Sequence, residues 1–313
     1  MKAIEVTPYN DIWPKLFEAE ALRIQSALGD NLKQIHHIGS TAVPGLPAKP
    51  IIDIIATAQD VSACIKDLEE IGYTYKGEYN IPFRFYFSRP GFHLHIYEAE
   101  NQEVESPELE LNIIFRDYLR KTPEAAREYS DLKSELIKRN EKIHPVFSSY
   151  ALGKDAFIRK ILKASGFDKV RMMHCAHEME WEAAKNFRQR YLEDHVFVSD
   201  PYLWTFNHPE HKHFVLYKGV EIIGYAHLQL RPGERATMRI IVIDKAARNQ
   251  SLGGVFLALC ERWLKIQGYA SLYIESSPKA YEFYKKHGYI EMEFRDPDGY
   301  ERDPKDIQIG KIL

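Results

Sequence analysis

The chain has 313 residues, which leaves room for two domains, since one domain usually takes about 100–200 residues. Hydrophobic residues make up 45% and charged residues 28%, and this composition excludes wholesale disorder, collagen and a coiled-coil rod. The formal net charge of -3, from 42 Lys+Arg against 45 Asp+Glu, gives no overall attraction for nucleic acid.

The cysteines and the apolar runs bear on where the protein works. Cys64, Cys175 and Cys260 lie far apart and form neither a CxxC pair nor a disulfide ladder. The first residues carry charge and proline where a signal peptide needs an apolar run, and no apolar stretch approaches the ~20 residues of a membrane span. We therefore expect a cytoplasmic protein with no membrane partner.

Helical and strand patterns alternate in the first half, which we expect to form one domain over 1–168. The alternation predicts a small α/β or α+β sheet with helices. The short, β-branched run at 50–56 is typical of a buried strand. The elements expected here are a helix at 13–24, the strand at 50–56, a helix at 61–71, strands near 73–77, 83–88 and 92–98, and mostly helix over 107–165.

The second half starts after a seam near 164–169, and we expect its domain over 172–313. The pattern again mixes strands and helices, and Gly219 supplies a turn between the first two strands. The elements expected here are helices at 178–193, 251–267 and 278–287, and strands at 214–218, 221–231, 237–243, 271–275 and 307–313.

A polar loop joins the strand that ends at Ile243 to a helix that starts near Ser251. Free N–H groups at a helix start favour negative charge, and Arg248 adds a fixed positive charge. Gly253 and Gly254 lack Cβ atoms, so a phosphate could come close. These features indicate a pyrophosphate site; the alternative is a helix start whose glycines only pack.

Two segments of this half together resemble the GNAT acyltransferase superfamily over roughly 172–313. The loop matches that family's R-x-x-G-x-G/A pattern as Arg248, Ser251 and Gly253. A later segment matches its A-x-x-F-Y-x-x-x-G-F/Y pattern, and the matching residues are Ala280, Phe283, Tyr284, Gly288 and Tyr289.

The resemblance implies a GNAT fold and direct transfer of an acetyl group from acetyl-CoA to a small-molecule amine. Tyr284 would protonate the departing thiolate, although an aromatic residue on this helix could simply pack in the core; Phe283 is expected to fill that apolar face instead. The backbones of Ile241 and Ile243 would pair with the pantetheine arm. The N–H groups expected to hold the pyrophosphate are those of Gln250, Ser251, Leu252, Gly253 and Gly254.

The chain departs from the family pattern in two places. Ser251 stands where the family has its first loop glycine, and its Cβ restricts the backbone. The stretch 237–239 reads Thr-Met-Arg where many relatives carry a glutamate base. Glu234, Glu275 and His227 are alternatives, or the amine could bind already deprotonated. The histidines of the loop over 202–213 predict a polar loop near the acceptor rather than a metal site.

The first half resembles the GrpB family over about 3–165, which is itself similar to the nucleotidyltransferase superfamily. The resemblance is carried by the runs His37–Leu46, Ala48–Ile54 and Phe115–Arg120, and by Tyr129-x-x-Leu132-Lys133. It implies that a Gly-Ser turn, here Gly39 and Ser40, binds a triphosphate, and that carboxylates such as Asp53 hold a divalent metal.

The carboxylate pair of that superfamily is incomplete here, because Ile51 and Ile55 flank Asp53. His93 and His95 alternate onto one face of their strand and could complete a metal site with Asp53, most suited to a transition metal. The alternative is that both histidines cover a solvated sheet face. Further cations could bind phosphate or form structural ion pairs, namely Lys49, Arg84 and Arg116.

These patterns lead to one expected function and several alternatives. We expect an N-acetyltransferase that carries a GrpB domain able to bind or transfer nucleotides. In one alternative the GrpB half is an inactive nucleotide-binding adaptor; in another the chain is a bifunctional nucleotidyltransferase and acetyltransferase. A CoA sensor without catalysis is a weaker alternative. The sequence leaves the oligomeric state open.

Overall fold

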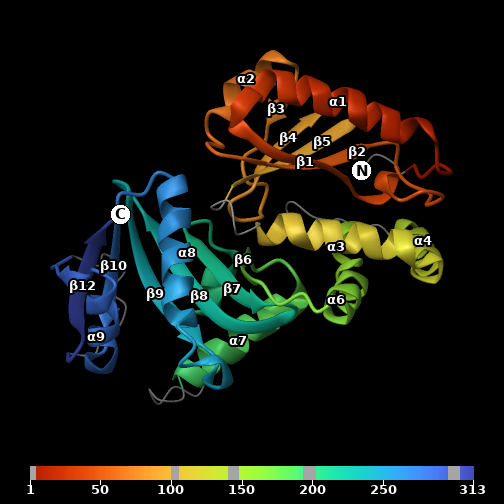
Figure 1. Ribbon diagram of the computed structural model, residues 1–313. Coiled ribbons are helices and arrows are strands. Elements are labelled where there is room, and N and C mark those ends of the chain that lie inside the picture. Colours follow the sequence, from red (N-terminus) through yellow and green to blue (C-terminus); the bar gives the residue numbers. More distant parts are fainter. Residues whose placement is uncertain (1–4, 100–105, 140–147, 193–201, 295–303) are drawn as a thin grey trace. The chain divides into compact units, whose positions relative to one another are not determined.

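The structure, a computed structural model, describes residues 5–99, 106–139, 148–192, 202–294 and 304–313. The chain divides into two compact units, Met1–Lys169 and Val170–Leu313. Each unit has its own mixed sheet and its own helices (Figure 1). The α/β class predicted for both halves is confirmed.

The sheet of the first unit has the strand order β1-β2-β5-β4-β3. β2 and β5 run parallel, and the other neighbours are antiparallel. The strands are β1 (Leu32–Ile38), β2 (Ile52–Ala58), β3 (Thr74–Tyr75), β4 (Phe85–Arg89) and β5 (Phe92–Glu98).

Helices cover both faces of this sheet. α1 (Ile12–Leu28) and α2 (Cys64–Glu70) lie on one face, and α3 (Pro107–Lys121) lies on the other (Figure 1). Ile54 packs into the core under α1, while Ile55 packs with Leu109 of α3. β2 is therefore buried on both faces, which explains its continuous apolar run. The remaining helices are α4 (Pro123–Lys138), α5 (Ser149–Leu152) and α6 (Asp155–Ala164).

β1 is absent from the sequence prediction. It is an edge strand whose first five residues are only partly buried or exposed, so it lacks the apolar pattern of a strand. Its antiparallel register sets Ile38 opposite Asp53 of β2. Gly39 and Ser40, which follow Ile38, are thereby brought next to Asp53.

The sheet of the second unit has the order β11-β12-β10-β9-β8-β7-β6. β9 and β10 run parallel, and all other neighbours are antiparallel. The strands are β6 (Val170–His174), β7 (His211–Lys218), β8 (Glu221–Arg231), β9 (Arg235–Ile243), β10 (Ser271–Ser276), β11 (Ile290–Glu291) and β12 (Ile307–Ile312).

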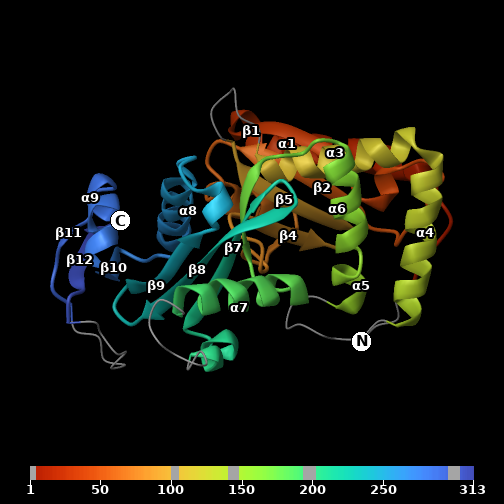
Figure 2. The ribbon, with the colours of Figure 1, turned by 90° about the horizontal axis from the view of Figure 1, so that it is seen from below.

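The α-helices that the structure describes in the second unit confirm the predicted helices to within a residue or two at each end. α7 (Glu178–Leu192) and α8 (Leu252–Ile266) lie on opposite faces of the sheet, and α9 (Pro278–Lys286) lies beside β10 and β12 (Figure 2). β6, a short edge strand of mixed polarity, is missing from the prediction. Among the helices that the structure describes, none is long and apolar enough to cross a membrane.

Candidate functional sites

The two parallel strands of the second sheet diverge at their carboxyl ends. Arg235–Met238 of β9 pairs with Ser271–Ile274 of β10, and the pairing stops there. β9 nevertheless continues to Ile243, still paired on its other side with β8. Arg239 is the extra residue of a β-bulge at the point of divergence, and bulges turn a strand locally. The β10 side of residues 239–243 is thus an edge that an extended ligand could pair with.

Hydrogen bonds and an ion pair join the loop after β9 to neighbouring residues. The Asp244 side chain accepts a hydrogen bond from the Ala246 N–H at 3.0 Å and pairs with Arg190 at 2.9 Å. Arg248 donates from Nε to the carbonyl of Ile243 at 3.1 Å. α8 then begins at Leu252, and the first N–H groups of a helix have no partner within it. The predicted pyrophosphate loop therefore does lead into a helix start beside the diverging strands.

Ser251, the N-cap of α8, has left-handed backbone angles of φ 59 and ψ 5. Its side chain makes no capping hydrogen bond. Glycine adopts this conformation freely, whereas a residue with a Cβ is strained in it. The glycine of the family pattern is therefore explained by backbone geometry, and the serine tolerates that geometry at a cost.

Replacing Ser251 with glycine is expected to raise the free energy of unfolding by about 1 kcal/mol, because the left-handed strain is relieved. Thermal and urea unfolding of the full chain measure this. Asn249→Gly is the matched control: Asn249 also has a positive φ of 62, but asparagine tolerates it better, so the gain should be smaller. Equal gains at both positions would contradict the explanation.

One of the two glycines at the start of α8 is closely packed, which was the alternative considered for this helix start. A Cβ on Gly254 would lie 2.5 Å from His287 Nε2, whereas one on Gly253 would lie 3.5 Å from the Phe283 ring, which is ordinary contact. His287 is held there by a hydrogen bond from Nδ1 to the Phe283 carbonyl, 2.8 Å long. The missing side chain of Gly254 therefore makes room for His287. The approach of a phosphate to the N–H groups of this helix start stays a prediction.

Tyr284 is the most buried aromatic residue of α9, at 7% exposure, and Phe283 is only partly buried. The expectation that Phe283 fills the apolar face and frees Tyr284 is therefore wrong. Tyr284 packs edge-on against Phe283, with ring centroids 5.2 Å apart, and Phe283 contacts the start of α8. Tyr284, the expected acid, therefore lies on α9, and α9 packs against the start of α8, the helix that directly follows the loop.

The three alternatives for a general base occupy different places. His227 is buried, and its ring nitrogens face His211 at 2.7 Å and Arg188 at 3.2 Å. Burial, together with the neighbouring His213 and Arg188, lowers the pKa of His227 well below its usual value. Glu234 lies in the turn before β9, at the far end from the loop. Of the three, Glu275 lies just beyond the last parallel pair of β9 and β10.

The polar loop predicted over 202–213 is confirmed for His208, which lies between η4 (Leu203–Asn207) and β7, but not for the two histidines that follow it. His211 and His213 belong to β7 and are buried, at 5% and 3% exposure. His213 hydrogen-bonds through Nδ1 to the Tyr225 hydroxyl at 2.7 Å and stacks on His227. Among the residues that the structure describes, no group of three His, Cys, Asp or Glu side chains is placed to hold a metal ion.

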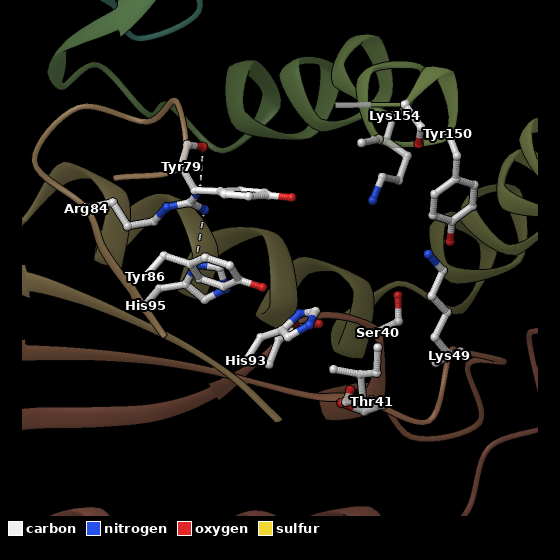
Figure 3. Close-up of a pocket in the computed structure, with 15 residues that line it drawn as sticks. Ser40, Thr41, Lys49, Tyr79, Arg84, Tyr86, His93, His95, Tyr150 and Lys154 are labelled. Carbon is white, nitrogen blue, oxygen red and sulfur yellow. Dashed lines mark hydrogen bonds and ion pairs between the residues drawn. The ribbon is translucent and has the colours of Figure 1, made fainter. Parts of the chain in front are cut away.

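The first unit contains a cavity of about 400 Å³ on the face of its sheet opposite α1 and α2 (Figure 3). Residues from β2, β4, β5, α5 and the start of α6 line it, so segments about 100 residues apart in the sequence meet there. The described lining residues are Ser40, Thr41, Ala48, Lys49, Ile51, Asp53, Tyr79, Arg84, Tyr86, His93, His95, Ser148, Tyr150, Ala151 and Lys154.

The predicted metal ligands share this cavity but do not form a metal site. Asp53 and His93 are paired in register, and their Oδ1 and Nδ1 atoms are 3.2 Å apart. Burial raises the pKa of Asp53, but the hydrogen bond from His93 and the positive charges around the cavity, that of Lys154 among them, bring it below its usual value, so the carboxylate is ionised. His95 Nδ1 instead accepts a hydrogen bond from Arg84 at 3.2 Å. Asp53, His93 and His95 are not arranged as three ligands, and the described residues hold no other group of three such side chains that could bind a metal ion.

The Gly-Ser turn contacts Asp53 on one side and Lys133 on another. Gly39 has φ 70 and ψ -171, and a Cβ there would lie 2.5 Å from Asp53 Oδ2. Ser40 lines the cavity and accepts a hydrogen bond from the buried Lys133 at 3.2 Å. Burial, and then the charge of Lys154, lowers the pKa of Lys133 to about 8. Gly39 therefore positions Asp53, while Ser40 faces the cavity.

The cations expected to meet phosphate separate into two groups. Lys49 and Arg84 line the cavity. Arg116 does not: it donates to the His37 carbonyl at 3.0 Å and pairs with Asp117 at 2.7 Å, so it is structural. Lys154 also lines the cavity. This lysine belongs to no motif, so the sequence alone does not indicate it, and only the fold brings it to the cavity.

Known proteins match the two units separately. Residues 3–164 match the family described as GrpB protein, and residues 175–289 match the acetyltransferase (GNAT) family. UPF0157 protein YqkA of Bacillus subtilis is 37% identical over 166 residues, which is 50% of this chain and 46% of that protein. UPF0157 protein BH1888 of Halalkalibacterium halodurans is 34% identical over 167 residues, 51% of this chain and 82% of that protein.

Among solved structures, the conserved protein GrpB from Enterococcus faecalis is similar to the first unit. It is 37% identical, covers 51% of this chain and 96% of its own, and gives a TM-score of 0.44. The chain spans less than half the length of YqkA. The two family matches together cover most of both units, so the chain belongs to the GrpB family and carries a GNAT acetyltransferase domain beside its GrpB domain.

Proposed function

We propose that the second unit transfers an acetyl group from acetyl-CoA to a small-molecule amine. The observation that carries the proposal is the divergence of β9 from β10 directly before the loop at 244–251 and the start of α8. The free edge of β9, through Ile241 and Ile243, suits the amide groups of a pantetheine arm. The helix start, with Arg248 beside it, suits a pyrophosphate.

The residues around this site supply the steps of direct transfer. The amine attacks the thioester carbonyl, a C–N bond forms, and the C–S bond breaks. The Tyr284 hydroxyl gives its proton to the departing thiolate and regains one from solvent. The proton released by the amine passes to solvent or to Glu275, which lies where the strands diverge. The Arg239 bulge turns the backbone where the thioester would lie.

Calorimetric titration of acetyl-CoA into the full chain tests the cofactor site. We expect saturable binding, and Arg248→Ala should weaken it by about tenfold, because a charged hydrogen-bond donor is lost and the loop loses its tie to Ile243. Lys245→Ala removes the same charge from an exposed position of the same loop and should change the affinity less. Absence of binding to the unmodified chain would refute the proposal.

The geometry also separates the alternatives for the GrpB domain. A metal-dependent nucleotidyltransferase needs ligands that Asp53, His93 and His95 do not provide together. A domain that binds a nucleotide and presents it to the acetyltransferase needs only the cavity. We therefore favour the nucleotide-binding module as the role of the GrpB domain. The three cysteines are buried free thiols, which supports our proposal of a cytoplasmic protein. Metal-dependent release of pyrophosphate from a nucleoside triphosphate, lost in Asp53→Ala, would reverse this preference.

A further inference from the structure

Two lysine side chains at one end of the first unit's cavity point toward the same ring. Lys49 Nζ lies 4.5 Å from the centre of the Tyr150 ring, and Lys154 Nζ lies 4.9 Å from it (Figure 3). No hydrogen bond or ion pair joins either ammonium group to another of the described residues. Two neighbouring cations in a partly enclosed space repel each other, and a bound anion removes that repulsion.

The charges around the cavity also favour an anion. Burial lowers the pKa of Lys49 and that of Lys154, and the Asp53 carboxylate offsets this only in part; the charge of Lys49 lowers the pKa of Lys154 further. Burial and the adjacent Arg84 lower the pKa of His95 to about 3, which keeps that ring neutral. Among the described lining residues, three basic side chains, those of Lys49, Arg84 and Lys154, therefore share a single carboxylate, that of Asp53.

The other end of the cavity is aromatic. The rings of Tyr79 and Tyr86 lie 5.2 Å apart, and the Arg84 guanidinium lies 4.9 Å from the centre of the Tyr86 ring. Arg84 also donates to the carbonyls of Glu78 and Tyr79, at 3.1 and 2.9 Å. These contacts form a wall of π faces with a cation beside it, suited to a planar ring.

The segment that presents Tyr79 is strained. Tyr79, Asn80 and Phe83 all have positive φ angles, of 48, 62 and 66, although none is glycine. Residues in such conformations persist where the surrounding contacts hold them, and they cluster at ligand sites. Here the two hydrogen bonds from Arg84 hold the segment.

Building on the nucleotide-binding role proposed for the first unit, we propose that this cavity binds a phosphate monoester that carries a planar ring, and that it does so without a metal ion. The phosphate dianion lies between Lys49 and Lys154, next to Ser40, and the ring lies against Tyr79 and Tyr86. His93, whose Nδ1 donates to Asp53, lies between the two ends, and its Nε2 accepts a hydrogen bond from a hydroxyl of the group that joins the phosphate to the ring. A volume of about 400 Å³ is sufficient for a ligand of nucleoside monophosphate size.

Calorimetry on the full chain, in EDTA, tests the proposal with three probes: inorganic phosphate, ribose 5-phosphate and the four common nucleoside monophosphates. We expect at least one monophosphate to bind, at least tenfold more tightly than ribose 5-phosphate, because the ring adds stacking. Equal affinity of ribose 5-phosphate and the monophosphates would overturn the role of the tyrosine wall. Absence of binding by every probe at millimolar concentration would overturn the whole proposal, as would binding that requires Mg²⁺.

Matched variants locate the site. Lys154→Gln should weaken monophosphate binding by at least tenfold, and Lys154→Arg should retain most of it. Lys160→Gln on the same helix removes an exposed lysine that pairs with Glu128, and it should have no effect. Arg248→Ala should also have no effect, and this separates the cavity from the proposed CoA loop of the second unit. Binding that is insensitive to Lys154→Gln but weakened by Arg248→Ala would refute the proposal.

Discussion

Replacing Tyr284 with phenylalanine is expected to lower kcat for acetyl transfer by about 100-fold while the Kd for acetyl-CoA changes little. The substitution removes only the hydroxyl, so the packing of Tyr284 against Phe283 is kept. Without the phenol the thiolate departs unprotonated, which raises the barrier to breaking the C–S bond. Steady-state kinetics with acetyl-CoA and an amine identified by an acceptor screen measure kcat, and calorimetry measures Kd.

A second tyrosine of α9 is the matched control. Tyr281 is on the same helix, and its hydroxyl bonds to Glu291 at 3.1 Å on the exposed side. Tyr281→Phe should leave kcat unchanged. If Tyr284→Phe also keeps the kcat of the unmodified chain across the pH range, Tyr284 is a packing residue, as its burial alone would allow.

The elements that the sequence predicted are those with a strong apolar pattern. β2 was recognisable because helices cover both of its faces, so that its residues are almost all buried. β1 and β6 were missed because edge strands need only one partner and carry few buried residues. β7 was predicted three residues too short, since His211 and His213 are polar in sequence but buried in the structure.

The residues of the candidate sites were likewise predicted only where a local sequence pattern contains them. Ser40, Lys49 and Asp53 were found because they lie in one short segment that resembles a known family. Lys154 and Tyr150 were missed because they lie about 100 residues further along the chain. Only the fold brings them to the cavity, and no local spacing in the sequence indicates it. Packing was considered for the glycines of α8, but the partner of Gly254 was not predicted, because the contact with His287 depends on where α9 packs.

Replacing Gly39 with alanine is expected to destabilise the first unit by about 3 kcal/mol, the largest effect on stability that we predict. Two causes combine. With φ 70 and ψ -171, Gly39 has a backbone conformation that residues with a Cβ rarely adopt. The added Cβ would also lie 2.5 Å from Asp53 Oδ2 and 3.0 Å from Asp53 Cβ, so β2 or the carboxylate must move. Urea unfolding of the full chain measures the loss.

Two further variants separate these causes. Gly45 has a similar φ of 77, but nothing lies within 4 Å of its added Cβ, so Gly45→Ala should cost only about 1 kcal/mol from backbone strain. The double variant Gly39→Ala, Asp53→Ala removes the overlap with the carboxylate but keeps the contact with the Cβ of residue 53, so it should recover part of the loss. Since Asp53 holds His93, Gly39→Ala should also weaken monophosphate binding in the cavity. If Gly39→Ala costs no more than Gly45→Ala, close packing on Asp53 is not the reason for the glycine.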